Sequence, residues 1–110
     1  MVADIFCLIV LGDTMHTVLL ILNCQPGKRA ALLEGLAASL PDTRAFDGCK
    51  LVETYVDNDN PDRAFLWEKW ESRAHQEKYM QWRVESGSMD AMADIFAGPP
   101  EIIHLGSNPA

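Results

Sequence analysis

Apolar and polar positions alternate with two different periods along this chain, which indicates a mixture of strands and helices. The run TVLLILNC at 17–24 is rich in β-forming residues and is followed by Pro26 and Gly27, so it predicts a buried strand that ends in a turn. Over 28–40 the apolar residues repeat with a helical period, and Pro41 follows them, which predicts a helix that ends before the proline. The apolar face of this helix comprises Leu33, Leu36, Ala37 and Leu40.

The second half of the chain begins with two predicted strands. Residues 49–57 and 64–70 alternate in polarity and flank the turn-rich loop DNDNPD, so they predict an antiparallel hairpin with a long connection. Ser72 is a good N-cap for a helix that extends to Glu85, and Gly87 ends that helix.

The remaining residues complete a recognisable order of elements. Ser88 can cap a short helix, and 101–105 predicts a last strand. The order βαββαβ, with one extra helix, is typical of a ferredoxin-like α+β fold, in which two helices cover one face of a four-stranded antiparallel sheet. The other face then carries Phe65 and Trp67, an apolar area that a monomer rarely exposes to water. The pattern therefore predicts a homodimer in which two sheets meet about a two-fold axis.

Charge and cysteine content narrow the class of partner. Sixteen acidic and nine basic residues give a net charge of −7 without any basic run, which argues against nucleic-acid and anionic-membrane partners. The cysteines, Cys7, Cys24 and Cys49, form no CxxC motif, so we interpret them as reduced thiols of a cytoplasmic protein.

The 110 residues leave room for one domain only. The apolar segment 2–11 is too short to span a bilayer and has no basic region before it, so it is not expected to be a signal peptide or a membrane span. We expect an extension over 1–15 that can add a strand, one domain over 16–106, and a tail at 107–110.

No common cofactor or catalytic motif is present, since the chain lacks GxGxxG, P-loop, HExxH and GxSxG patterns. The loop DNDNPD lacks the central Gly and the later Glu of a calcium loop, so it predicts a solvated turn. The three histidines are far apart in sequence, and no metal site is expected.

All three tryptophans fall within one strand–turn–helix segment, 67–82. Two faces of this segment are predicted to meet, with Leu66, Glu68 and Trp70 on the strand and His75, Tyr79, Trp82 and Arg83 on the helix. Such a surface is aromatic with a few polar atoms, which is typical of a small-molecule site. The alternative is that the aromatic residues are simply core. The carboxylate of Glu68 would need a partner, expected to be Arg83, or would have a raised pKa.

Several short motifs together resemble the antibiotic biosynthesis monooxygenase domain. They are PGK at 26–28, TRAFDGC at 43–49, and EKWES at 68–72 with Ala74 and His75 after it. The stretches YMQWRVESG at 79–87 and GPPEI at 98–102 are similar to a subgroup described as quinol monooxygenases. The resemblance covers 17–105.

This resemblance implies a dimeric α/β barrel built from two ferredoxin-like chains. Enzymes of the family oxidise phenols, quinols or anthrones with molecular oxygen, and they need no flavin, haem or metal cofactor. The implied partners are therefore a small aromatic substrate and oxygen. Haem oxygenation is not expected, because Leu20 and Met80 stand where the haem-degrading branch carries Asn and His.

The resemblance also suggests roles for individual residues. Trp70 matches a tryptophan that lines the family's substrate cavity, His75 is placed to act as the base, and Arg83 can balance a phenolate charge. The expected substrate-binding residues are Leu20, Leu22, Leu66, Glu68, Tyr79, Trp82, Met92 and Phe96. Two alternatives stay open: a binding module without turnover, and an isomerase or lyase on the same fold.

Overall fold

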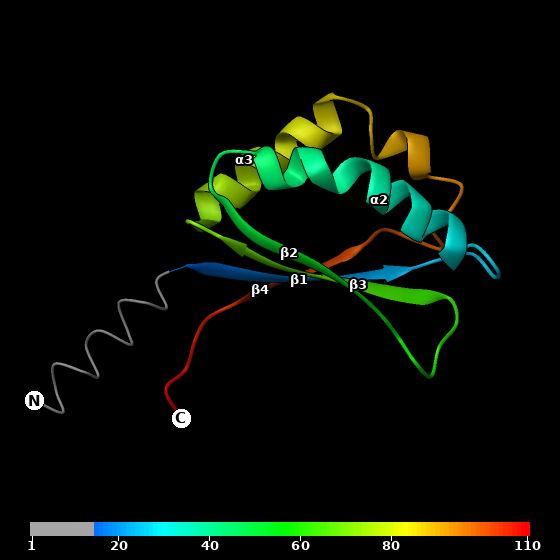
Figure 1. Cartoon of the computed structure of the whole chain (residues 1–110), viewed down its shortest axis with the longest axis horizontal. Coiled ribbons are helices and arrows are strands. Elements are labelled where there is room, and N and C mark those ends of the chain that lie inside the picture. The colour runs from blue at the N-terminus through cyan, green and yellow to red at the C-terminus, as the bar shows by residue number, and fades with distance from the viewer. Residues whose placement is uncertain (1–14) are drawn as a thin grey trace, which may run out of the picture.

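The computed structural model describes residues 15–110, so the extra strand predicted within 1–15 lies, apart from Met15, outside the described residues. The sheet is antiparallel with the strand order β2-β3-β1-β4, and α2 and α3 lie together on one of its faces (Figure 1). This arrangement confirms the predicted ferredoxin-like α+β fold. The elements are β1 (His16–Asn23), α2 (Arg29–Ala45), β2 (Cys49–Val56), β3 (Arg63–Trp70), α3 (Arg73–Glu85), the 3-10 helix η1 (Asp90–Met92) and β4 (Glu101–Leu105).

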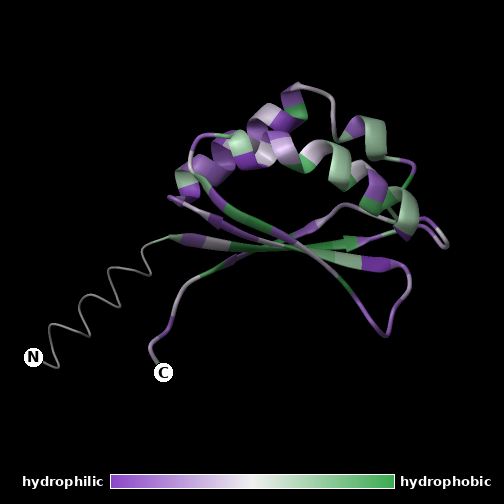
Figure 2. Ribbon diagram, in the orientation of Figure 1, coloured by the Kyte–Doolittle hydropathy of each residue, from purple (hydrophilic) through white to green (hydrophobic). Residues whose placement is uncertain are grey.

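Period-two burial in the central strands produces the core. In β3 every second residue is buried, and β1 alternates in the same way. These side chains pack against Leu32, Leu36 and Leu40 of α2. Each buried leucine contributes about 1.5–3 kcal/mol through removal of apolar surface from water. Figure 2 shows hydrophobic residues concentrated along the strands, whereas α3 is largely hydrophilic.

The helix α2 is longer than the sequence predicts. It continues through Pro41 and ends at Ala45, so the prediction that it stops before the proline is wrong. Pro41 lacks an N–H, and its ring crowds the carbonyl of Ala37, but both residues are exposed, so water can solvate that carbonyl. Burial of Leu40 and Thr43 on the opposite side favours the additional turn.

The predicted helix after Gly87 is only the three-residue η1. Ser88 does not cap it, because its hydroxyl donates instead to the carbonyl of Arg83. The following segment is held to the end of β1 by backbone hydrogen bonds from Gln25 to Ile95 and from Ala97 to Asn23. It thereby covers one end of the helix–sheet interface.

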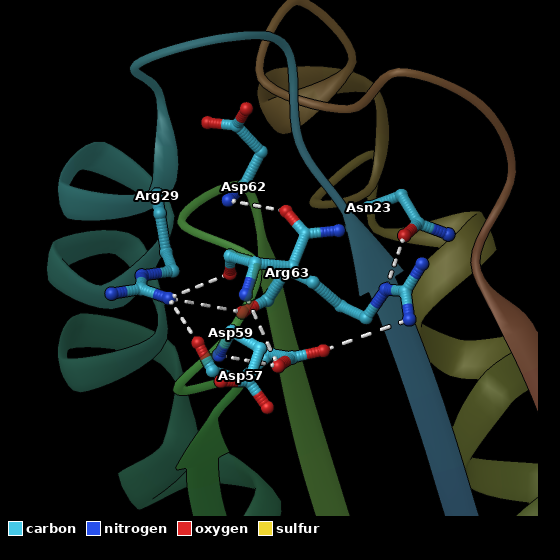
Figure 3. Close-up of polar contacts among 7 residues, drawn as sticks. Asn23, Arg29, Asp57, Asp59, Asp62 and Arg63 are labelled. Carbon is cyan, nitrogen blue, oxygen red and sulfur yellow. Dashed lines mark hydrogen bonds and ion pairs between the residues drawn. The ribbon is translucent and has the colours of Figure 1, made fainter.

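Arg29 closes the β2–β3 loop. Arg29 Nη1 donates to the carbonyl oxygens of Asp57 and Asn60, each at 3.0 Å (Figure 3). Arg63 lies beside them, donating to Asn23 Oδ1 and pairing with Asp57 at 3.6 Å. Side-chain oxygens of Asp57 and Asn60 accept further hydrogen bonds from loop N–H groups. The loop is thus a turn satisfied by its own residues and Arg29.

We expect Arg29→Ala to lower the free energy of unfolding by about 1.5–3 kcal/mol, because partly buried carbonyl groups lose a charged donor. Chemical denaturation measures this change. Arg73→Ala is the matched control, since Arg73 is exposed and pairs with Glu77 at the surface at 3.7 Å, and it should cost less than about 1 kcal/mol. Equal effects of the two substitutions would contradict the role given to Arg29.

No described helix covers the second face of the sheet. Leu19 lies opposite both Trp67 and Ile103 in the strand register, and Ile21 lies opposite Phe65. We call this set, Leu19, Ile21, Phe65, Trp67 and Ile103, the open face. Neither helix of the described region has the length and apolar character that a membrane span requires.

Candidate functional site

A cavity lies between the sheet, α2, α3 and the segment after Gly87, with a volume of about 120 Å³. That is several times the roughly 15 Å³ that one water molecule needs. Eight residues named from the sequence line it: Leu20, Leu22, Leu66, Glu68, Tyr79, Arg83, Met92 and Phe96. The sequence did not indicate its other lining residues, which are Leu36, Ser39, Leu40, Met80, Ser88, Met89 and Pro100.

Glu68 is the one carboxyl group that residues 15–110 place in the cavity wall. Its side chain is almost wholly buried, with the residue 2% exposed, and Oε1 accepts a hydrogen bond of 2.8 Å from the indole N–H of Trp70. Within the described residues no hydrogen bond is made to Oε2. Burial raises the pKa of this carboxyl group, and the indole hydrogen bond opposes the rise.

Arg83 also lines the cavity, but the expected Glu68–Arg83 ion pair does not form. Arg83 Nε donates to the Tyr79 hydroxyl at 2.6 Å, and Nη2 donates to the Ser39 carbonyl at 2.8 Å and to Thr43 Oγ1 at 2.9 Å. No carboxylate pairs with it among residues 15–110. The reason is geometric, since those hydrogen bonds tie the guanidinium to α2 and Glu68 is bound by Trp70.

Most of the aromatic cluster lies beside the cavity, and only its Tyr79 is also part of the lining. Trp70 is fully buried, with its ring centroid 5.0 Å from that of Tyr79 and 6.3 Å from that of Phe46. Trp82 is 37% exposed and contacts Phe46 and Arg83 from outside. Neither Trp70 nor Trp82 lines the cavity. Trp70 instead positions the carboxyl group of Glu68.

His75 lies at the opposite end of α3 from Arg83 and does not line the cavity. Ser72 is the N-cap, as predicted, and its hydroxyl accepts from the His75 backbone N–H and lies 2.6 Å from Nδ1. Nε2 lies 3.7 Å from both Asp47 and Glu71. The first turn of the helix therefore directs His75 toward the loop before β2.

Gly48 makes this position of His75 possible. Its φ is +87°, and a Cβ there would lie 2.5 Å from the imidazole carbons Cγ and Cδ2. Gly87 has a φ of +75° but no atom within 4 Å of the corresponding Cβ position. A side chain at Gly87 would therefore add backbone strain alone, whereas a side chain at Gly48 would add both backbone strain and a clash with His75.

We expect Gly48→Ala to destabilise the fold by more than Gly87→Ala, which should cost only the strain of the left-handed backbone, about 1–2 kcal/mol. Thermal unfolding of both variants measures the difference. Equal losses would show that His75 moves aside without cost.

Among residues 15–110 no group of three or more His, Cys, Asp or Glu side chains is arranged to hold a metal ion. Among the described residues the cavity wall offers one carboxyl group, one guanidinium, one phenol and the two serines Ser39 and Ser88, and its other lining residues are apolar. Such a set can accept a proton, stabilise an anion and donate a hydrogen bond.

Comparison with known proteins identifies a family for this chain. The family model for antibiotic biosynthesis monooxygenase matches residues 15–83. A search of curated proteins gave no significant match.

Solved structures share the fold. The Rv0793 protein of Mycobacterium tuberculosis superposes with a TM-score of 0.74 at 22% identity, covering 87% of this chain and 97% of its own. The PA3566 protein of Pseudomonas aeruginosa gives a TM-score of 0.74 at 19% identity, covering 86% and 94%. A protein from Bordetella bronchiseptica, provisionally assigned as an antibiotic biosynthesis monooxygenase, gives 0.69 at 23% identity, covering 86% and 97%.

Proposed function

The chain belongs to the antibiotic biosynthesis monooxygenase family, and from this premise we propose that it oxidises a small aromatic hydroxyl compound with molecular oxygen, without flavin, haem or metal. The observation that supports this proposal best is the buried Glu68 carboxyl group in an apolar cavity that also contains Arg83. A ring can occupy the apolar walls, while its hydroxyl group meets the few polar atoms.

Glu68 replaces His75 as the proposed base, because Glu68 reaches the cavity and His75 does not. The substrate hydroxyl, or the acidic C–H of its keto tautomer, transfers its proton to Oε2. The raised pKa of Glu68 makes its carboxylate a stronger base than an exposed glutamate. The Trp70 indole keeps the other oxygen fixed during this transfer.

Arg83 and Tyr79 are proposed to stabilise the resulting anion. The guanidinium has no carboxylate partner within the described residues, so its charge is available to an oxyanion. Its hydrogen bonds to Ser39 and Thr43 hold it in place before the substrate binds. The conformational entropy of the Arg83 side chain is therefore already lost on folding, and substrate binding need not order it.

The electron-rich anion then reduces oxygen itself, so the reaction balances without another reductant. For an anthrone, the ring methylene loses two hydrogens and gains one oxygen atom as a carbonyl, and the second oxygen atom leaves as water. The apolar cavity limits the access of bulk water to the reacting pair. The protein supplies binding, a base and a counter-charge.

The open face supports a homodimer as part of this proposal. Its apolar side chains come from adjacent strands and form one continuous surface. A second copy can cover it by an isologous sheet-to-sheet contact. The cytoplasmic location remains a prediction.

Oxygen uptake with a panel of hydroquinones and anthrones tests the proposed activity. Uptake that depends on both protein and aromatic compound is expected. Quenching of tryptophan fluorescence by the same compounds without oxygen uptake would instead identify a binding module.

A further inference from the structure

Two histidines from the first and last strands meet at one end of the sheet, and neither lines the cavity. Val18 lies opposite His104 in the β1–β4 register. His16 precedes Val18 by two residues, so it is on the same face and diagonal to His104. His16 Nε2 lies 2.6 Å from His104 Nδ1, and the ring centroids are 4.9 Å apart.

This pair has the chemistry of a metal ligand set. Neutral imidazole is the commonest protein ligand for transition metals, and its bond to the ion is about 2.0–2.1 Å long. Two neighbouring ligand nitrogens on an octahedral ion are then about 3 Å apart. The observed separation of 2.6 Å is close to this value. If the two rings rotate about χ2, both nitrogens can bind one metal ion in place of the proton that they now share.

Burial, together with neighbouring charges, favours the unprotonated form of His16. Burial, His104 and Arg73 lower the pKa of His16, in that order of effect, and Glu77 acts in the opposite direction. The lowered pKa favours the neutral imidazole, which is the form that binds a metal ion. Arg73 lies 3.7 Å from Glu77, which partly offsets its repulsion of an incoming cation. Both rings are carried by paired strands, so little ordering is needed on binding.

We propose that His16 and His104 form a two-imidazole site for a divalent first-row transition metal ion, with water in the remaining coordination positions. Within the described residues no third His, Cys, Asp or Glu completes a larger set. A two-ligand site of this kind binds modestly and exchanges its ion readily. It stands independently of the proposed oxygenase activity.

Calorimetric titration of the full chain with Ni²⁺ at neutral pH tests the proposal, since Ni²⁺ suits imidazole ligands. One equivalent should bind, and His16→Ala or His104→Ala should each weaken binding about tenfold or more. The control His75→Ala should bind Ni²⁺ as the parent does, although His75 lies near Asp47 and Glu71. Absent binding, unchanged binding in His16→Ala, or loss in His75→Ala would overturn the site.

A second measurement does not depend on the folding of a variant. Ni²⁺ is paramagnetic and broadens the proton signals of its ligands, so the imidazole signals of His16 and His104 should broaden before those of His75 in the wild-type chain. Lowering the pH should reverse the effect, because protons compete for the same nitrogens. Broadening of His75 first would contradict the assignment.

Discussion

Glu68→Gln should reduce oxygen uptake with a responsive aromatic compound by about a hundredfold or more, because removal of a general base has an effect of this size. The amide is close to the carboxyl group in size, and its oxygen can still accept the Trp70 indole hydrogen bond, so the cavity should keep its shape. The rate constant from the oxygen electrode is the measurement. Glu34→Gln, an exposed change on α2, is the control and should leave uptake unchanged.

The same variant should change the dependence of stability on pH. Because folding raises the pKa of Glu68, the folded state binds its proton more tightly than the unfolded state does. This stabilisation is complete below the unfolded-state pKa and is lost as the pH rises through the folded-state pKa. The wild-type chain should therefore lose stability relative to Glu68→Gln over this interval in denaturation at several pH values. Parallel pH profiles would contradict a buried, proton-binding Glu68.

Trp67→Asp should convert the predicted homodimer into a monomer. Trp67 lies near the middle of the open face, opposite both Leu19 and Glu53, so the substitution removes apolar area from the contact and puts a second carboxylate beside Glu53. Light scattering should give the mass of two 12.2 kDa chains for the parent and of one chain for the variant. Val84→Asp is the control, because Val84 is 62% exposed on the helix side.

A monomeric parent, or a dimer that persists in Trp67→Asp, would contradict the sheet-to-sheet contact. Loss of the dimer in both variants would indicate general destabilisation rather than an interface. Far-UV circular dichroism of each variant separates these cases.

The alternating pattern was sufficient to predict the sheet and the face that packs on the helices. Leu66, Glu68 and Trp70 lie on that face because period-two burial is a local property of a strand. The end of α2 was not predictable in the same way. Whether Pro41 stops a helix depends on whether the carbonyl it frees can reach water, and that is decided by tertiary packing.

The contacts between the site residues were harder to predict from the sequence than the identity of the residues that line the cavity. Helical spacing placed His75 and Arg83 on one face, but they are about two turns apart, so they reach different ends of the sheet. The partner of Glu68 was its neighbour on the strand, Trp70, and no charge pattern indicates an indole donor. Phe46 was missed because it lies in a loop, outside any periodic segment.

The most direct test of the central claim is mass spectrometry of the product formed from an anthrone under ¹⁸O₂. The account predicts that the quinone gains one ¹⁸O atom and that the other appears in water, at a rate that falls strongly in Glu68→Gln. A quinone without ¹⁸O, or an equal rate in Glu68→Gln, would contradict oxygenation in the cavity that Glu68 and Arg83 line.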